Sequence, residues 1–397
     1  MKLLFIHEVN YETKVIFEIH EFPELLALRG HEIHYIHCPE KIGIRKFNLR
    51  SRVKTISGRA YPEADIKLIT PPTFGGSFID RVISTVTSIP LLYQQLKNEK
   101  YDAVVLFSVP TTGWQTALIA RRFKTPVLFR ALDVSHLLRS AISRKLVFWA
   151  ERIVYQNVKA ISANNSALAQ YCVSHNAQHV PVIINVPPLD LAHFHKAKND
   201  LSVRANYKIL PDDFVLMFMG TLYEFSGLDQ VINDFARIRP IETKLVIVGG
   251  GKDEVKLRNL VADLQLSEEV LFTGVIPYNL LPEVLGIADV AINSFVPSLV
   301  TDVAFPHKVL QYLAAGLVTV STKLAGLYDS LGENAGIYWV DETSQVLEKA
   351  LDLKKNPATN ISEIRNLGRA FVQEKFNKEK AVSEFESAIE GISCESK

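Results

Sequence analysis

A segment in the last third of the chain combines a proline, a lysine and a glutamine in a pattern that suits phosphate binding. Phe305–Gly316 reads FPHKVLQYLAAG and follows a predicted strand and loop. Proline fits the first turn of a helix, where free N–H groups and the positive end of the helix dipole attract anions. Lys308 adds a cation, and Gln311 lies on the same helix face. The segment predicts a phosphate site, although an amphipathic core helix without a ligand would show the same apolar spacing.

Three consecutive glycines, Gly249–Gly251, follow a predicted strand and precede a predicted helix. In the dinucleotide fingerprint G-x-G-x-x-G the last glycine would fall on Glu254, so we do not expect a nicotinamide or flavin site. The chain also lacks the phosphate-binding motif G-x-x-x-x-G-K-[ST] and the nucleophile motif G-x-S-x-G. The glycines therefore indicate a tight turn that lets a ligand approach the backbone.

Three histidines, His31, His34 and His37, recur every third residue along a predicted strand. Successive side chains of a strand point to opposite faces, so these three would not converge on one metal ion. We interpret them as polar positions of a half-exposed strand and expect no metal site.

A strongly basic segment, Lys41–Arg59, contains seven Lys and Arg residues and no acidic one, with apolar residues interleaved. Such a pattern is typical of a surface that binds an anionic membrane or a lipid substrate. Phe74, Phe78, Ile79 and the apolar segment Val82–Tyr93 follow soon after. A solvated loop and an ordinary helix are the alternative; a nucleic-acid interface is not expected, because no recognition motif accompanies the charge.

These features lie in a pattern that alternates between short apolar runs and stretches with helical spacing. The runs predict buried strands and the helical spacing predicts amphipathic helices. Strands are expected at residues 2–7, 32–38, 102–108, 126–129, 214–220, 244–248, 270–273, 290–293 and 318–321. Helices are expected at residues 15–29, 112–123, 228–238, 253–264, 280–287 and 306–315. A segment with two adjacent prolines, Val182–Asp200, reads as a linker between two halves.

Alternation of this kind predicts the α/β class, with parallel sheets covered by helices on both faces. We therefore expect two Rossmann-like, doubly wound domains facing each other across a cleft. Ligands of such sheets bind beyond the carboxyl ends of the strands.

The composition is that of an ordinary globular protein, since the 397 residues are 48% hydrophobic and 22% charged. The three cysteines are scattered, which predicts no disulfides. The lack of a long apolar run predicts no spanning helix. An N-terminus without a cleavage site predicts no secretory signal. The net charge of +1 hides an asymmetry: residues 1–200 contain 25 Lys and Arg against 16 Asp and Glu, and the remainder carries −8. We expect a cytoplasmic protein whose halves meet different partners.

Three segments, Leu25–His34 (LLALRGHEIH), Ile184–Phe194 and Phe218–Leu228, follow one another along the chain. In this order they resemble the opening signature, the linker and the start of the second domain of the retaining glycosyltransferases of family 4. Further landmarks follow in the same order at Val246–Gly251, Val270–Gly274, Ala288–Ala291 and Lys308–Val320. The resemblance covers essentially the whole chain and implies the GT-B fold, with sugar transfer from a nucleotide sugar to an acceptor.

The resemblance implies an acceptor-binding domain at residues 1–190 and a nucleotide-sugar-binding domain at 191–375. Residues 376–397 would form a C-terminal helix that returns to the first domain. The implied substrates are a UDP- or GDP-linked sugar and a lipid-linked or surface-glycan acceptor, with no cofactor and no metal. The basic N-terminal half would then make peripheral contact with the inner face of the membrane.

The family's functional positions can be carried over to this chain one by one. Its phosphate-loop glycine corresponds to Gly220, its base-binding loop begins at Val275 and Ile276, and its ribose-binding position is Gln311. Its N-domain catalytic region falls near Phe129–His136. The implied donor-binding set is Gly220, Thr221, Val275, Ile276, Phe305, Pro306, His307, Lys308 and Gln311; Asp133 and His136 are the catalytic candidates, and Arg130 and Lys323 are possible phosphate contacts.

The chain departs from the family at positions that matter for chemistry. The paired glutamates of the family are Val303 and Gln311 here, with Asp302 beside them, and its basic pair is Thr221 and Ser226. Lys308 and Lys323 are candidate replacements for the missing positive charge. The departures leave two alternatives to a sugar transferase: a non-catalytic subunit that binds a partner glycosyltransferase or a glycolipid, and a sugar-nucleotide epimerase of the same fold.

Overall fold

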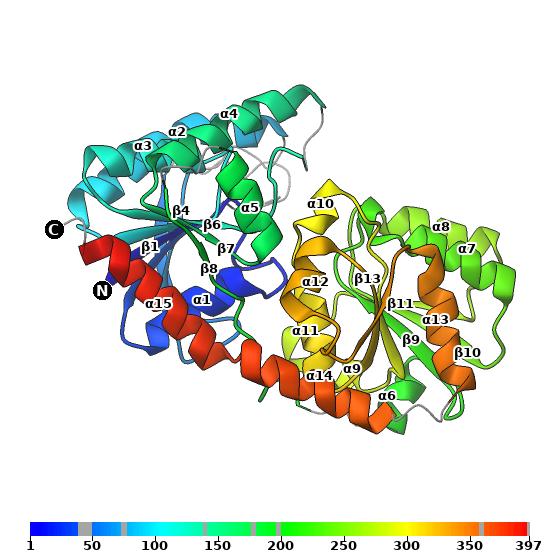
Figure 1. Cartoon of the computed structure of the whole chain (residues 1–397). Coiled ribbons are helices and arrows are strands. Elements are labelled where there is room, and N and C mark those ends of the chain that lie inside the picture. Colours follow the sequence, from blue (N-terminus) through cyan, green and yellow to red (C-terminus); the bar gives the residue numbers. More distant parts are fainter. Residues whose placement is uncertain are drawn as a thin grey trace. The chain divides into compact units, whose positions relative to one another are not determined.

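A computed structural model describes residues 1–38, 50–72, 78–137, 141–175, 180–195, 200–356 and 361–394 (Figure 1). The chain divides into two compact units. Unit 1 comprises Met1–Pro188 and Lys378–Lys397, and unit 2 comprises Leu189–Asn377. Residues 41–49, the first part of the basic segment predicted to meet a membrane, lie outside the described residues, as does Phe74.

Unit 1 is built on an eight-stranded sheet in the order β3-β4-β2-β1-β5-β6-β7-β8. Neighbouring strands are parallel except for β3, which is antiparallel to β4 at the edge. The central strands are almost fully buried because helices cover both faces, which explains their continuous apolar runs. The strands are β1 (Lys2–Ile6), β2 (Glu32–Ile36), β3 (Arg52–Ser57), β4 (Asp65–Thr70), β5 (Ala103–Leu106), β6 (Val127–Ala131), β7 (Ala160–Ala163) and β8 (Val182–Ile184).

The helices of unit 1 form two layers, one on each face of the sheet. One layer holds α1 (Glu18–Leu28) and the C-terminal helix α15 (Lys378–Cys394), whose Phe22 and Phe385 stack with ring centroids 4.0 Å apart. The other holds α2 (Phe78–Asn98), α3 (Gly113–Arg122) and α4 (Ala141–Asn157) (Figure 1). The short helix α5 (Ser166–Ser174) connects β7 to β8. Residues from the two ends of the chain therefore share one core.

Unit 2 contains a six-stranded sheet, entirely parallel, in the order β11-β10-β9-β12-β13-β14. Its strands are β9 (Phe214–Met219), β10 (Thr243–Val248), β11 (Val270–Gly274), β12 (Val290–Asn293), β13 (Val318–Thr322) and β14 (Ile337–Val340). Its helices are α6 (Leu201–Asn206), α7 (Leu228–Ile238), α8 (Glu254–Asp263), α9 (Leu281–Leu285), α10 (Leu299–Asp302), α11 (His307–Ala314), α12 (Ala325–Leu331), α13 (Ser344–Lys355) and α14 (Ile361–Lys375), with short 3-10 turns at Glu224–Ser226 and Tyr278–Leu280.

The structure confirms the predicted α/β class with parallel, doubly wound sheets. It differs from the prediction over the described part of the basic segment, where Arg52–Ser57 forms the edge strand β3. Val53 and Thr55 alternate with Arg52 and Lys54, and β-branched residues of this kind suit pairing with β4, which leaves the outer edge exposed. Lys54 forms an ion pair with Glu12 across 2.7 Å. Charged side chains on an edge strand also prevent pairing with other chains.

Candidate active site

Two glycines form a bare surface of backbone at the carboxyl ends of β9 and β10. Gly220 and Gly249 have φ angles of +144° and +126°, which residues with a side chain rarely adopt. A Cβ atom on Gly249 would lie 2.1 Å from the carbonyl oxygen of Gly220. The N–H of Gly220 donates to the carbonyl of Val248 at 2.9 Å, which keeps the two turns together. The glycine run is therefore a tight turn, as the sequence predicts, and the neighbouring turn at Gly220 packs closely against it. The approach of a ligand to this backbone stays a prediction.

Lys308 lies directly beside Gly220. The Nζ atom of Lys308 is 3.8 Å from the position of a Cβ on Gly220. It also lies 3.7 Å from the ring centroid of Phe218 and 3.9 Å from that of Phe295. Two residues of the predicted donor-binding set, separated by 88 positions in the sequence, are thus neighbours. Gly220 and Lys308 lie together because β9 pairs with β12, and β12 precedes the helix α11 that bears Lys308.

The ammonium group of Lys308 is buried, with the residue only 7% exposed, and it has no hydrogen-bond partner among the described residues. Burial lowers the pKa of this lysine well below its usual value. The two aromatic rings offset part of the cost by cation–π attraction. A buried cation without a hydrogen-bond acceptor is expensive to maintain, so this arrangement favours an anionic ligand at the same place.

The helix α11 is held against the end of β9. Its capping residue is Pro306, and the first helical residue is His307, one position later than the sequence predicts. The hydroxyl of Tyr312 accepts a hydrogen bond from the N–H of Met219 at 2.6 Å. Phe305 is buried and stacks on Phe376, with ring centroids 5.8 Å apart. These contacts fix the first turn of the helix at the edge of the sheet that bears Gly220.

The remaining predicted donor residues fall around the same edge or on α11. A Cβ on Gly250 would lie 3.4 Å from Cγ2 of Val275, which places the predicted base-binding loop next to the glycine turns. Val275 is 65% exposed and Ile276 is half-buried. Gln311 is half-buried on α11, and Thr221 follows Gly220 in its turn.

Lys323, the other candidate cation, has partners of its own. Its Nζ atom lies 3.8 Å from the ring centroid of Tyr328 and 3.9 Å from a carboxylate oxygen of Glu333. The side chain is exposed, so this pair contributes little to stability. Asp302 accepts a weak hydrogen bond from the N–H of Ala325 at 3.4 Å. Val303, at the family's glutamate position, is buried.

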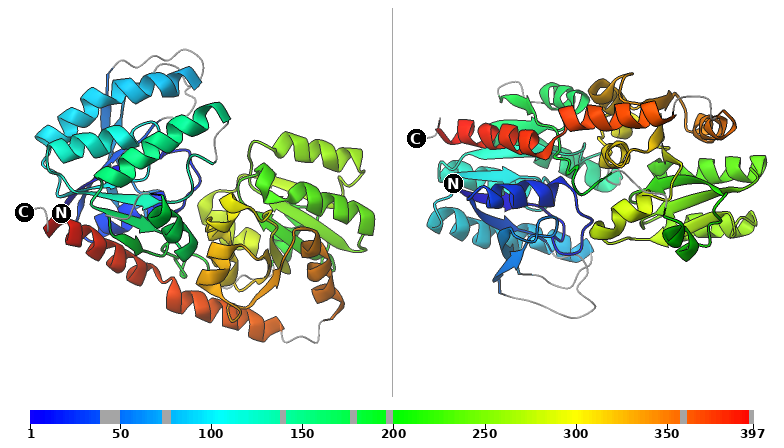
Figure 2. Two further views of the ribbon diagram at one scale, coloured as in Figure 1. Left: turned by 45° about the horizontal axis from the view of Figure 1, so that its top comes forward. Right: turned by 90° about the horizontal axis from the view of Figure 1, so that it is seen from below.

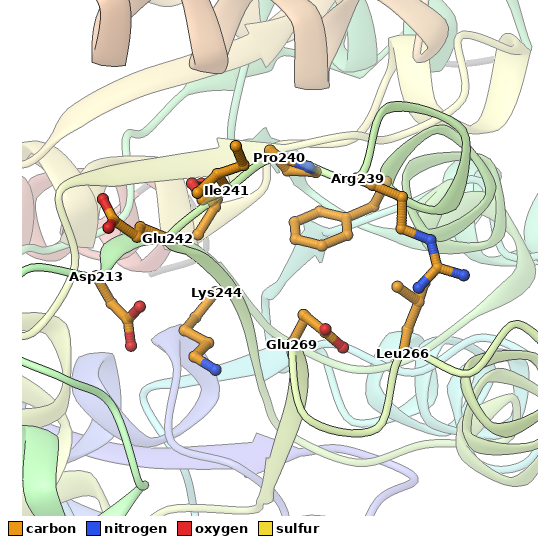
Figure 3. Close-up of a pocket in the computed structure, with 10 residues that line it drawn as sticks. Asp213, Arg239, Pro240, Ile241, Glu242, Lys244, Leu266 and Glu269 are labelled. Carbon is orange, nitrogen blue, oxygen red and sulfur yellow. The ribbon is translucent and has the colours of Figure 1, made fainter.

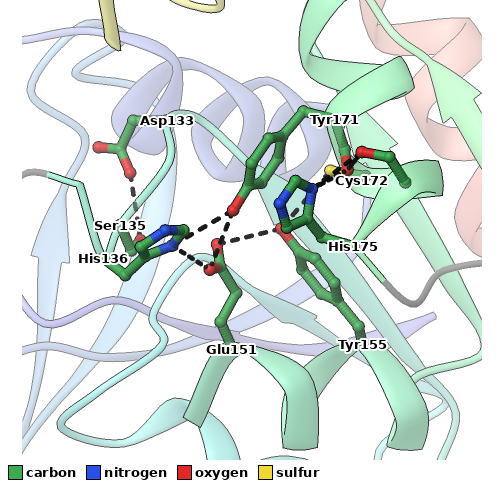
Figure 4. A network of polar contacts seen from close by, with 9 residues as sticks. Asp133, Ser135, His136, Glu151, Tyr155, Tyr171, Cys172 and His175 are labelled. Carbon is green, nitrogen blue, oxygen red and sulfur yellow. Dashed lines mark hydrogen bonds and ion pairs between the residues drawn. The ribbon is translucent and has the colours of Figure 1, made fainter. Parts of the chain in front are cut away.

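In unit 1, the catalytic candidates lie in one turn that follows β6. The hydroxyl of Ser135 donates to Asp133 at 3.1 Å. Nδ1 of His136 lies 2.7 Å from a carboxylate oxygen of Glu151 on α4 (Figure 4). The hydroxyls of Tyr171 and Tyr155 donate to the same carboxylate at 3.3 and 3.2 Å. Glu151 is therefore a buried acceptor for three donors, and its partner His136 is largely buried, with 12% of the side chain exposed.

Glu151 is not among the site residues that the sequence predicts. The only signal is that Glu151 is the single acidic residue in the sequence of α4, AISRKLVFWAERIVYQN. Its pairing with His136, 15 residues earlier, depends on how α4 packs against the turn.

Arg130 is not available for phosphate binding, contrary to the sequence-based expectation. It is completely buried, and its guanidinium donates to Glu18, Ser162 and the carbonyls of Ala163 and Asn185. Nε lies 2.8 Å from the Glu18 carboxylate, which Nη2 also contacts. The residue connects α1 to β6 and β7 as part of a buried ion pair. The alternation of side chains along β6 points Arg130 into the layer under α1, and the sequence alone does not reveal its partner.

The predicted histidine positions each have a different partner. His34 contacts the hydroxyl of Tyr101 at 2.7 Å, His37 contacts that of Thr70 at 2.8 Å, and His31 pairs with Glu386. Over the ranges that the structure describes, no three His, Cys, Asp or Glu side chains gather in a way that could hold a metal ion.

A pocket of about 380 Å³ lies at the amino ends of β9 and β10, on the opposite edge of the sheet from Gly220 (Figure 3). It contains none of the predicted site residues. Parallel sheets bind ligands at their carboxyl ends, so we do not assign the donor to it. Its lining is Asp213, Phe235, Arg239, Pro240, Ile241, Glu242, Thr243, Lys244, Leu266 and Glu269.

Family models match both halves of the chain. The model described as "Glycosyl transferase 4-like domain" matches residues 20–186, and the one described as "Glycosyl transferases group 1" matches residues 201–365. The chain is 25% identical over 197 residues to the N-acetyl-alpha-D-glucosaminyl L-malate synthase of Bacillus anthracis, across 48% of this chain and 49% of the relative. An uncharacterized glycosyltransferase of Methanocaldococcus jannaschii is 24% identical over 190 residues. The chain matches about half the length of these curated relatives.

Solved structures resemble the chain over nearly its whole length. HepE of Anabaena, in complex with UDP and glucose, aligns with a TM-score of 0.76 at 14% identity, across 98% of this chain and 99% of that one. The sucrose-phosphate synthase of Thermosynechococcus elongatus aligns with a TM-score of 0.76 at 15% identity, across 98% of both chains. At such identities the likeness shows a shared fold.

Proposed function

The chain belongs to the GT4-type glycosyltransferases, which have the GT-B fold, and on this premise we propose that it transfers a sugar from a nucleotide-sugar donor to an acceptor hydroxyl with retention at the anomeric carbon. The observation that carries the proposal is the buried ammonium of Lys308, which has no hydrogen-bond partner among the described residues and lies beside the backbone of Gly220. A diphosphate placed there would supply the missing counter-charge and would meet the first turn of α11.

In the proposed reaction, the bond between the anomeric carbon and the diphosphate oxygen breaks while the acceptor oxygen attacks from the same face. The acceptor proton passes to the departing diphosphate. Lys308 and the amino end of α11 stabilise the negative charge that develops on this leaving group. They take the place of the family's basic pair, since Thr221 and Ser226 carry no charge. This scheme requires neither a metal nor a cofactor.

The nucleoside would lie on the same edge of unit 2. We assign the base to the loop at Val275 and Ile276, which adjoins Gly250, and the ribose hydroxyls to Gln311, an amide that both donates and accepts. UDP is the first donor nucleotide to test, because the similarly folded HepE is described in complex with UDP. GDP is the second.

We assign the acceptor to unit 1, with Asp133 and His136 as the groups that orient its hydroxyl. The net charge of +9 over residues 1–200 suits an anionic acceptor. The malate in the name of the Bacillus anthracis relative is an anion as well. We propose a lipid-linked or surface-glycan acceptor at the inner face of the membrane, with the protein in the cytoplasm.

A thermal-shift experiment with the full chain tests the donor site. UDP, GDP, ADP and CDP are added separately, with and without Mg²⁺, to the wild type, Lys308→Met and Lys323→Met. A ligand at a hundredfold excess over its Kd stabilises the native state by about 2.7 kcal/mol. We expect a shift with one nucleotide for the wild type and Lys323→Met but none for Lys308→Met. A shift that survives Lys308→Met, or that depends on Lys323 instead, contradicts the assignment.

Turnover distinguishes the enzyme from the non-catalytic subunit. The assay uses the nucleotide sugar that binds, and it measures hydrolysis or transfer of the sugar as release of the nucleoside diphosphate. A protein that binds the nucleotide but never releases the sugar would favour the subunit. An altered sugar nucleotide as product would favour the epimerase.

A further inference from the structure

The outer face of α2, α3 and α4 exposes large apolar side chains that have no place in the core of unit 1. Leu146 and Trp149 on α4 are 73% and 60% exposed, and Val86 on α2 is 65% exposed. Single exposed apolar residues are common, but a group of this size marks an interaction surface. The lipid-facing residues proposed below are Val86, Ile89, Tyr93, Leu118, Leu146 and Trp149.

These residues belong to one layer of helices. The helix α3 contacts both α2 and α4, and the left view of Figure 2 shows the three helices side by side. Nε2 of Gln115 on α3 donates to the carbonyl of Thr85 on α2 at 2.7 Å. Nη1 of Arg121 on α3 donates to the side chain of Asn157 on α4 at 2.9 Å. Because this layer covers one face of the sheet, the exposed residues of all three helices lie on its outer side.

The charged side chains that the structure describes on the outer face of these three helices are all basic. The single described acid of the three helices, Glu151, is buried against His136. Aromatic and basic groups are interleaved, since the guanidinium of Arg152 lies 5.2 Å from the ring of Trp149 and Nζ of Lys97 lies 6.0 Å from that of Tyr93. The basic residues on the three helices are Lys97, Arg121, Arg122, Arg144, Lys145 and Arg152.

We propose that the outer face of α2, α3 and α4 binds the surface of an anionic membrane. Apolar and aromatic side chains enter the boundary between headgroups and acyl chains, while Lys and Arg remain at the phosphate level. A second copy of the chain does not fit, because a two-fold contact would place one basic patch against another. Nucleic acid suits the charge but leaves the aliphatic side chains exposed to water. The inference deepens the proposed lipid-linked acceptor and rests on it for its purpose, although the binding itself needs no sugar transfer.

Sedimentation of the full chain with lipid vesicles tests the proposal. Vesicles of phosphatidylcholine mixed with phosphatidylglycerol are compared with vesicles of phosphatidylcholine alone, without donor or acceptor. We expect the wild type to bind the mixed vesicles, and binding to decrease as salt is added. Arg144→Gln/Lys145→Gln should weaken it about tenfold or more, since each basic residue near the surface contributes separately. Equal binding to both kinds of vesicle would overturn the electrostatic part of the proposal.

A pair of matched variants tests the apolar part. Leu146→Gln/Trp149→Gln should reduce binding to the mixed vesicles about tenfold or more. Ile241→Gln/Val255→Gln alters two apolar residues of unit 2 that are slightly more exposed, at 80% and 70%, and should bind as the wild type does. Circular dichroism confirms that each variant is folded. Loss of binding in both pairs, or in neither, would overturn the proposed surface.

Tryptophan fluorescence provides a second measurement that does not depend on a destabilising change. Brominated lipids quench a tryptophan that enters the membrane, and we expect quenching in the wild type that is lost in Trp149→Phe. Quenching that persists in Trp149→Phe and is lost in Trp339→Phe would assign the contact to β14 of unit 2 and overturn the proposal. A failed transfer assay with intact vesicle binding would count against the proposed function alone, and the reverse result against this surface alone.

Discussion

The ammonium group of Lys308 combines burial with the lack of any described hydrogen-bond partner. In the free protein its pKa is well below the usual value because burial disfavours the charged form. A diphosphate beside it would favour the charged form and raise the pKa in the complex. Between these two pKa values, binding of UDP takes up a proton, and the affinity for UDP falls as the pH rises.

Calorimetry of UDP binding in buffers with different ionisation enthalpies measures this proton uptake. We expect the wild type to take up at most one proton on binding UDP. Lys323→Met, which keeps Lys308, should take up the same number. An affinity that is unchanged across the alkaline range would show that Lys308 does not titrate with the ligand.

The burial of Lys308 also predicts that Lys308→Met, which should lose UDP binding, makes the ligand-free protein more stable. Removing a buried amine without a hydrogen-bond partner should stabilise the ligand-free protein by about 1–3 kcal/mol at neutral pH. Because the folded pKa lies below the unfolded one, this penalty is present at neutral pH, shrinks as the pH rises towards the unfolded pKa and is gone above it. Urea denaturation at neutral and alkaline pH should show the gap between variant and wild type closing. A variant that is less stable at neutral pH would contradict the burial of the charge.

The carboxylate of Glu151 fixes the position of His136, and we interpret Glu151 as a positioning residue. Glu151→Gln should lower kcat about ten- to hundredfold and leave the KM of the donor unchanged, since displaced catalytic groups lose rate without loss of donor binding. The pH–rate profile should change as well, which a purely structural defect would not produce. Glu63→Gln, at an exposed acid of unit 1, is the matched control. Equal kinetics of the two variants would remove Glu151 from the site.

At the scale of elements, the glycine turns after β9 and β10 depend on close backbone contact. Gly249→Ala places a methyl group 2.1 Å from the Gly220 carbonyl, so one of the two turns must move. We expect weaker UDP binding and a loss of about 1–3 kcal/mol of stability. Gly332→Ala separates the two causes, because its φ of +65° is also left-handed but no atom lies within 4 Å of the added Cβ. Similar UDP affinity in both variants would contradict the role of the turn.

The sequence predicts elements better than it predicts their neighbours. The strands β5 and β9 are foreseen because buried parallel strands are short apolar runs. The basic edge strand β3 is not predicted from the sequence, since its register with β4 depends on pairing that composition does not reveal. The site shows the same limit: Lys308 is found from helix-end chemistry, whereas its contact with Phe218 and Phe295 depends on β9 lying beside β12. Arg130 is misjudged for the same reason, because its partner Glu18 lies 112 residues away.

At the scale of the whole molecule, the two units differ in which segments of the chain form them. Unit 2 is continuous from Leu189 to Asn377, whereas unit 1 needs the C-terminal helix α15 to complete its core. Val382, Phe385 and Ile389 are buried in the cluster that contains β1 and α1. The core of unit 1 is therefore complete only when α15 is packed into it.

This dependence predicts that damage to α15 affects the two units unequally. Phe385→Ala removes a ring that stacks on Phe22 and lies under the guanidinium of Arg130, with 5.8 Å from centroid to Cζ. We expect a loss of about 3–5 kcal/mol in unit 1, seen as a transition at lower temperature in calorimetry. UDP should still raise the transition of unit 2, because the Lys308 site belongs to that unit. Leu367→Ala, at a half-exposed residue of α14, is the control. If Phe385→Ala lowered both transitions equally and abolished UDP binding, the units would unfold as one cooperative body.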